Sequence, residues 1–196
     1  TLTVFSMDVQ YTLKMPQPST HYFEVTMNVK GVKSKQTNLK MATWTPGSYL
    51  IREYARNVES VVAKDSKGKI ISCTKSAKNI WNVNTDGTAS FTVSYRVYAN
   101  EMAVRNCYLD FEQGYLNGAS VFLYVQGAEK SKATLNIELP PAFKQVITAL
   151  KPIGTSGTQF EIQNLDELID SPILCGNPLV VSFEAGGVKH RVAFQG

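Results

Sequence analysis

The feature that most constrains the fold of this chain is a regular alternation of apolar and polar side chains. Within residues 5–13, 23–29 and 91–97, every odd-numbered position is apolar and every even-numbered position is polar. Because successive side chains of a strand point to opposite faces, a period of two is typical of half-buried strands. Further strands are expected over the ranges 57–64, 69–74, 79–84, 89–98, 121–125, 133–139, 144–149, 158–163, 178–184 and 188–195.

Turn signals lie between several of these segments. Asp86-Gly87 predicts a hairpin between the strands over 79–84 and 89–98, and Gly186-Gly187 predicts a tight turn that joins the last two strands. Many short strands separated by turns indicate an all-β fold, either an antiparallel β-sandwich or an open barrel.

Only one segment has a helical pattern. Residues 165–170 follow Asn164, a suitable N-terminal cap, and Pro172 would end the helix. Because the chain has no internal repeat and no low-complexity linker, we expect a single domain over 1–196. The alternation lapses near 100–118, which is where a subdivision would fall.

Composition and charge exclude several functions. The net charge is +4, and the lysines cluster beside turn signals such as Gly31 and 65–68, so we expect solvated hairpin tips. No nucleic-acid partner is expected, because base-stacking aromatic side chains do not interleave with these lysines. The best apolar run, 121–125, is far shorter than the ~20 residues of a membrane span. The chain begins at Thr1 without an initiator Met, which fits a trimmed or a mature exported protein.

The three cysteines, Cys73, Cys107 and Cys175, are widely spaced and include no Cys-x-x-Cys pair. This spacing argues against a disulfide scaffold or a zinc site and favours small buried hydrophobic residues, although one disulfide among them stays open. The two histidines, His21 and His190, lie on different predicted strands and begin no His-Glu-x-x-His helix. For His190 we expect a hydrogen-bonded core or interface position. No catalytic residue and no metal ligand is therefore assigned, and we expect no enzymatic activity from this chain alone.

Three stretches depart from the alternation. Residues 44–57 combine a Pro-Gly turn with aromatic and charged side chains, which suits a packed surface more than a hairpin tip. In the segment 108–124, Gly114 and Gly118 frame Tyr115 and Asn117, a pattern that predicts a flexible loop beside a sheet. The segment 164–172 places three carboxylates around the short helix.

Taken in this order, the three stretches resemble the amino-terminal domain of the glycyl aminopeptidase family, zinc metallopeptidases that often carry a PDZ module. The resemblance rests on Trp-Thr-Pro-Gly-Ser-Tyr at 44–49 with Ile-Arg-Glu-Tyr-Ala-Arg-Asn at 51–57. It continues with Gly-Tyr-Leu-Asn-Gly-Ala-Ser at 114–120, Asp-Glu-Leu-Ile-Asp-Ser-Pro at 166–172 and the closing His-Arg-Val-Ala-Phe-Gln-Gly at 190–196.

The resemblance implies an open, saddle-like β domain that precedes a catalytic domain with one zinc ion. The catalytic domain of the same polypeptide and the peptide substrate of the full enzyme are then the expected partners. No position in this chain matches the family's zinc ligands or general base, so zinc is expected only in that catalytic domain. The resemblance also suggests a periplasmic, cell-envelope or secreted protein, with cytoplasmic members expected too.

The same resemblance leads to two hypotheses about site residues. Tyr115 and Asn117 would line the peptide-entry side of the cleft. Tyr49, Arg52, Glu53 and Tyr54 would form the interdomain contact, because arginine and aromatic side chains dominate interface energetics.

Two alternatives remain open on sequence. The chain could be a stand-alone extracytoplasmic β-sandwich that binds carbohydrate or peptide through exposed Trp44, Trp81 or Tyr115. Core positions are expected for both tryptophans, which argues against such a platform. It could also be a purely structural domain that holds the catalytic unit.

Overall fold

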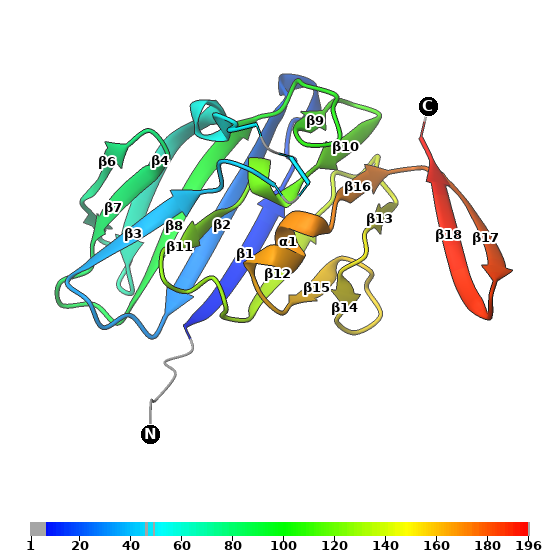
Figure 1. The fold of residues 1–196 in the computed structure, drawn as a ribbon. Coiled ribbons are helices and arrows are strands. Elements are labelled where there is room, and N and C mark those ends of the chain that lie inside the picture. Colours follow the sequence, from blue (N-terminus) through cyan, green and yellow to red (C-terminus); the bar gives the residue numbers. More distant parts are fainter. Residues whose placement is uncertain (1–6, 46, 49, 196) are drawn as a thin grey trace.

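The computed structural model describes residues 7–45, 47–48 and 50–195, and the strands within them form four sheets (Figure 1). The largest sheet has eight strands, and all neighbours are antiparallel except β1 and β12, which run parallel. In spatial order they are β14 (Lys151–Pro152), β15 (Gln159–Ile162), β12 (Ala133–Glu138), β1 (Asp8–Lys14), β2 (Tyr22–Lys30), β8 (Ser90–Tyr98), β4 (Val58–Asp65) and β5 (Ile70–Ile71).

The alternation read from the sequence sets the buried face of this sheet. Tyr11 of β1 lies opposite Met27 of β2, which in turn lies opposite Val93 of β8, so the three side chains share one face. All three are buried, and the polar residues between them alternate to the opposite side of the sheet. The half-buried strands predicted for these segments are therefore confirmed.

A second, four-stranded sheet packs over this buried face, and the fold is an all-β assembly as expected (Figure 1). Its order is β11 (Leu123–Val125), β3 (Gln36–Met41), β7 (Ile80–Asn84) and β6 (Cys73–Ala77). Trp81 of β7 lies in the shared core, as predicted. Two buried tyrosines join the layers, because the Tyr11 hydroxyl donates to the Leu123 carbonyl (2.8 Å) and the Tyr95 hydroxyl donates to the Val121 carbonyl (3.1 Å).

The turn at Asp86-Gly87 forms, but the hairpin predicted there is wrong. Gly87 has a φ of +79°, and the Thr88 N–H donates to the Thr85 carbonyl at 3.1 Å. However, β7 pairs with β3 and β6, whereas β8 pairs with β2 and β4. The buried Thr85 hydroxyl donates to the Ser34 carbonyl (2.7 Å), which holds the end of β7 in the smaller sheet. The turn therefore carries the chain from one layer to the other.

A third sheet and the one α-helix among the described residues close one end of the fold. The sheet has the order β13 (Gln145–Ile147), β16 (Ile173–Gly176), β10 (Gln113–Leu116) and β9 (Cys107–Leu109). The helix α1 spans Leu165–Asp170, and the Asn164 side chain accepts from the Glu167 N–H at 2.9 Å, as the capping pattern predicted. The described residues also contain the 3-10 turns η1 (Pro18–Thr20), η2 (Tyr54–Asn57) and η3 (Gly118–Ser120).

The last two strands form a hairpin that projects from the rest of the molecule (Figure 1, red). Strand β17 (Leu179–Ala185) pairs only with β18 (Val188–Phe194) among the described residues. Gly186 and Gly187 join them with φ values of +59° and +76°, which confirms the predicted tight turn. No helix among the described residues is long and apolar enough to cross a membrane.

Candidate functional site

One end of the molecule gathers the long connections that sequence analysis singled out. The connection from β3 to η2 folds back on itself, because the Arg52 N–H donates to the Thr43 carbonyl at 2.6 Å. Gly47 has the positive φ, +74°, that the Pro-Gly turn predicted, while Pro46 and Tyr49 lie outside the described residues. The proposed contact role of Tyr49 therefore stays a sequence prediction.

Two adjoining hollows lie around η2 and share Ile51, Arg52, Glu53 and Arg56. The smaller has a volume of about 230 Å³ and is polar, and the larger has a volume of about 580 Å³ and extends toward β6. The smaller cavity is lined by Ile51, Arg52, Glu53, Tyr54, Arg56, Asn57, Glu101 and Asn106. Its walls thus come from η2 and its preceding loop on one side and from the loop of residues 99–106 on the other.

Both carboxylates in this wall already have cationic partners. Glu53 pairs with Lys78 at 2.6 Å, and this hydrogen bond lowers the pKa of Glu53. Glu101 lies 3.8 Å from Arg56. Both ion pairs are solvent-exposed, so they contribute little to the stability of the fold, but they leave Glu53 and Glu101 with a cationic partner each.

Two polar atoms in the same wall are buried without a hydrogen-bond partner: Arg52 Nε and the hydroxyl oxygen of Tyr54. Tyr54 is only 3% exposed, and burial raises its pKa while the charges of Arg52 and Arg105 act to lower it. Among the described residues, neither Arg52 nor Arg105 forms an ion pair with a carboxylate. A buried donor left unsatisfied costs about 1–3 kcal/mol, so this arrangement needs an explanation.

The two residues predicted to line a peptide cleft lie beside this cavity, but not in a flexible loop. Tyr115 belongs to β10, and its hydroxyl donates to the Val104 carbonyl at 3.0 Å. Asn117 is 7% exposed and caps η3, with its side-chain oxygen accepting from the Ala119 N–H at 3.0 Å. The prediction of flexibility is therefore wrong, because the flanking glycines sit within a strand and a 3-10 turn where other groups approach closely.

The fold brings the described members of the two predicted groups of site residues to one place. The Asn117 N–H donates to the carbonyl of Asn106 at 3.0 Å, and Asn106 lines the cavity with Arg52 and Tyr54. The 3-10 turns η2 and η3 are also in contact. Because these residues lie far apart along the chain, the sequence alone does not show that they meet.

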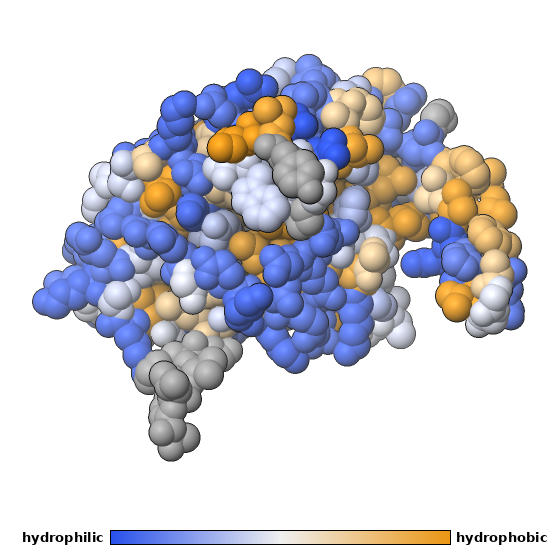
Figure 2. Space-filling view, viewed as in Figure 1, coloured by the Kyte–Doolittle hydropathy of each residue, from blue (hydrophilic) through white to orange (hydrophobic). Residues whose placement is uncertain are grey.

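Exposed apolar side chains lie on the loops that form this cavity. Trp44 is 57% exposed, so the core position predicted for it is wrong; it lies on the connection after β3, outside the packed layers. Ile51, Met102 and Val104 are exposed as well. Figure 2 shows apolar residues interspersed with hydrophilic ones along the upper rim of the molecule.

The histidines and cysteines are distributed without forming a reactive cluster. His190 is exposed on the projecting hairpin and stacks on Phe183 with ring centroids 5.1 Å apart, so the core position predicted for it is wrong.

Burial raises the pKa of Cys107 to about 11 and that of Cys175 to about 12, which fits the predicted buried thiols. Cys73 is only partly buried, and all three cysteines are free. Within the described residues, no three His, Cys, Asp or Glu side chains are grouped to hold a metal ion.

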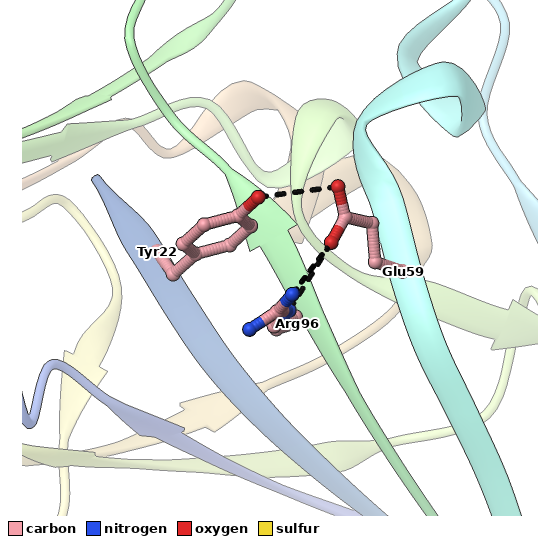
Figure 3. Close-up of polar contacts among 3 residues, drawn as sticks. All are labelled: Tyr22, Glu59 and Arg96. Carbon is pink, nitrogen blue, oxygen red and sulfur yellow. Dashed lines mark hydrogen bonds and ion pairs between the residues drawn. The ribbon is translucent and has the colours of Figure 1, made fainter. Parts of the chain in front are cut away.

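A further polar cluster lies on the solvent face of the large sheet (Figure 3). The Tyr22 hydroxyl donates to one carboxylate oxygen of Glu59 at 3.1 Å, and Arg96 donates to the other oxygen through Nε (3.2 Å) and Nη2 (2.9 Å). The Arg96 guanidinium also lies over the Tyr22 ring, 4.3 Å from its centroid. In this cluster an arginine and a tyrosine share one carboxylate, and each of them has its partner.

The packed sheets define the class of this chain as an all-β domain, and the η2 cavity lies at one end of it. Residues 10–177 match the family model for the peptidase M61 N-terminal domain, and the chain belongs to that family. No curated protein matches the chain.

Solved structures show the same fold. A crystal structure of an aminopeptidase N family protein from Idiomarina loihiensis has a TM-score of 0.89 at 30% identity, over 96% of this chain and 32% of that one. An M1 zinc metallopeptidase mutant from Deinococcus radiodurans has a TM-score of 0.53 at 10% identity, over 91% of this chain and 44% of that one. The chain thus spans about a third to a half of the length of these structures.

Proposed function

We propose that this chain is the non-catalytic front domain of a zinc aminopeptidase of the glycyl aminopeptidase type, a type that often carries a PDZ module. In this proposal it packs against the catalytic domain of the same polypeptide and helps to shape the peptide-binding cleft. Membership of the M61 N-terminal domain family supports the proposal. So does the Idiomarina structure, of which this chain spans about a third (32%).

The observation that carries the proposal is the exposed apolar face of the β17–β18 hairpin. Cross-strand pairing places alternate residues of both strands on one face, and Phe183 on that face is 51% exposed. The opposite face carries Glu184, Lys189 and Arg191. An isolated two-stranded hairpin is marginally stable in water, so a face of this kind calls for a covering partner. The apolar face consists of Leu179, Val181, Phe183, Ala185, Val188, His190, Val192 and Phe194.

The covering partner that we propose is the catalytic domain. The family match ends at residue 177, just before the hairpin begins, while the Idiomarina likeness extends over 96% of the chain. The hairpin thus lies outside the family match but, at least in large part, within the likeness to that relative.

Variants on the two faces of the hairpin test this packing. In the full-length enzyme, Phe183→Ser should lower the melting temperature, because loss of a well-packed aromatic contact at an interface costs about 2 kcal/mol or more. In the isolated chain, where the face is exposed, the same substitution should leave the melting temperature unchanged. Arg191→Ser, on the opposite face, is the matched control. Equal melting temperatures for the Phe183→Ser variant and the wild-type full-length enzyme would refute the proposed packing.

The loop before η2 provides a second proposed contact with the catalytic domain, through Tyr49, Arg52, Glu53 and Tyr54. Arg52 and Tyr54 each have an unpartnered buried polar atom, which supports a role for them at an interface. If Arg52→Ala left the melting of the intact enzyme unaltered, this assignment would be wrong.

We also propose that Tyr115 and Asn117 shape the peptide-entry side of the cleft. Their position beside the η2 cavity supports this, and both tie backbone segments together there. Tyr115→Ala or Asn117→Ala should reduce kcat/KM on glycyl substrates in the full-length enzyme. The control is Asn164→Ala, which removes a comparable cap from α1 without touching the cavity. Unchanged kcat/KM for both variants would exclude the role.

Zinc is assigned to the catalytic domain and not to this chain, since the described residues offer no group of ligands that fits it. The location that we propose is the periplasm, the cell envelope or the extracellular medium, with the cytoplasm as the alternative. Cell fractionation followed by detection of the full-length protein would distinguish these compartments.

A second candidate function is a stand-alone extracytoplasmic module that binds carbohydrate or peptide. The exposure of Trp44 favours it, because exposed aromatic rings form binding platforms. Binding of a glycan or peptide to the isolated chain, lost in Trp44→Ala and retained in the hairpin variant Phe183→Ser, would support this function over the first.

A further inference from the structure

We propose that the cavity between η2 and the loop of residues 99–106 is a carboxylate-binding site, and that its occupant is an Asp or Glu side chain of the catalytic domain. The inference rests on the proposed function, because it names the group that the proposed interdomain contact inserts here. Its starting point is that Arg52 and Tyr54 both line one cavity of about 230 Å³, and that the Arg52 Nε and the Tyr54 hydroxyl are buried without a hydrogen-bond partner.

The charged side chains around the cavity include one positive charge that no carboxylate of the described residues balances. The two acids of the cavity, Glu53 and Glu101, are paired with Lys78 and Arg56. Arg52 forms no ion pair among the described residues, so its positive charge is not compensated. A single carboxylate would balance that charge, whereas a phosphate dianion would meet repulsion from the two acids in the same wall.

Elsewhere in this chain, a carboxylate is bound by the same two kinds of side chain, an arginine and a tyrosine. In the cluster of Figure 3, Tyr22 donates to one oxygen of Glu59 and Arg96 donates to the other. At the cavity, Arg52 and Tyr54 supply the same two kinds of donor, and the acid is missing. Guanidinium and phenol donors suit the two oxygens of a carboxylate, and hydrogen bonds to an ionised acceptor are the stronger ones.

The surroundings favour a protein side chain over a free peptide. The cavity has a volume of about 230 Å³, which admits one acidic side chain. Ile51, Met102 and Val104, on the loops that form it, are each more than half exposed. Apolar surface around a half-buried arginine and a buried tyrosine is the composition typical of the centre of a protein interface.

The first test observes the Arg Nε–H signals of the isolated chain by NMR while acetate is added. We expect the Arg52 signal to shift and saturate, because its donor is vacant. The Arg96 signal should stay in place, because its donor already binds Glu59. Tyr54→Phe should weaken acetate binding about threefold to tenfold, the effect of one lost hydrogen bond. An Arg52 signal that does not move, or that moves no more than that of Arg96, would overturn the site.

The second test repeats the titration on the full-length enzyme and identifies the source of the acid. If the catalytic domain supplies it, the Arg52 signal should already be shifted without acetate and should not respond to it. If acetate still titrates Arg52 there, the site is open and the assigned occupant is wrong. The hairpin variants report separately on domain packing. Packing supported by Phe183→Ser together with an unresponsive Arg52 in the isolated chain would therefore refute this inference and leave the proposed function standing.

Discussion

At the scale of single residues, Gly118 shows how a missing side chain lets two distant elements meet. A Cβ built at this position would lie 2.2 Å from the Leu168 carbonyl oxygen and 2.9 Å from its carbon. These are backbone atoms of α1, which cannot move aside as the end of a side chain can. Gly118 is therefore required for the contact between η3 and α1, and not for the flexibility that the sequence pattern predicted.

Gly118→Ala should lower the free energy of unfolding by about 2–4 kcal/mol, because the added methyl group forces the helix away from η3. Urea unfolding measures the loss. Gly114→Ala is the control, since the three nearest atoms to its Cβ would all be side-chain atoms, of Leu109 and Met15 at 3.2 Å and of Phe23 at 3.5 Å. Similar losses for the two variants would contradict the explanation.

The thiols give a second prediction at this scale. Cys107 and Cys175 have pKa values of about 11 and about 12 because burial disfavours the thiolate. At pH 8 an aromatic disulfide reagent should therefore react with at most Cys73 in the folded chain and with all three thiols after unfolding.

The raised pKa values of the two buried thiols also mean that unfolding releases thiol protons above about pH 9. Stability should accordingly fall as the pH rises from 8 to 10, and a higher urea midpoint at pH 10 would disagree with this.

At the scale of elements, strand β11 depends on hydrogen bonds that arrive from the other layer. The Tyr95 hydroxyl of β8 accepts from the Leu123 N–H at 2.9 Å and donates to the Val121 carbonyl at 3.1 Å. Tyr11 of β1 donates to the Leu123 carbonyl. A short strand is thus held by side chains as well as by its own antiparallel pairing with β3.

Tyr95→Phe should cost about 2–4 kcal/mol, because it leaves a buried N–H and a buried carbonyl without a partner while the ring is retained. Thermal or urea unfolding measures the loss. Tyr98→Phe on the same strand is the matched control, since that ring is 38% exposed and its hydroxyl only accepts from the Asn100 side chain. A loss in Tyr95→Phe no larger than in the control would show that the bridge does not stabilise the layers.

At the scale of the whole molecule, stability is expected to be uneven. The two packed layers share one hydrophobic core, whereas the β17–β18 hairpin pairs only with itself among the described residues. Regions with few buried contacts open at low free-energy cost. The surface that we propose for the catalytic domain is therefore also the least stabilised part of the isolated chain.

Hydrogen exchange should show this contrast directly. In the isolated chain, the backbone amides of β17 and β18 should exchange much faster than those of β1, β2 and β8, because the hairpin lacks a covered face. In the full-length enzyme, the hairpin amides should become protected. Slow exchange of the hairpin in the isolated chain would show that its stability does not depend on a covering domain.

The family comparison supports the sequence-based resemblance at the level of the domain. The family match over 10–177 contains the motifs at 44–57, 114–120 and 166–172 on which the resemblance depended, whereas the closing motif at 190–196 lies outside it. The glycyl specificity and the PDZ module remain proposals, because the family match concerns the N-terminal domain alone.

What the sequence determined by itself was local. The alternation defined the buried faces of β1, β2 and β8, Asn164 marked the start of α1, and Gly186-Gly187 marked the final turn. Each of these features depends on side chains within a few residues of one another, so a short stretch of sequence contains the necessary information.

Only the tertiary structure decided which distant segments become neighbours. It turned the Asp86-Gly87 connection into a crossing between layers, and it placed β1 parallel to β12. It also left Trp44 exposed and brought Arg52 and Tyr54 to one cavity without an acid between them. Whether a strand, a ring or a charge has a partner depends on every other segment that could reach it, and that long-range competition leaves no local pattern in the sequence.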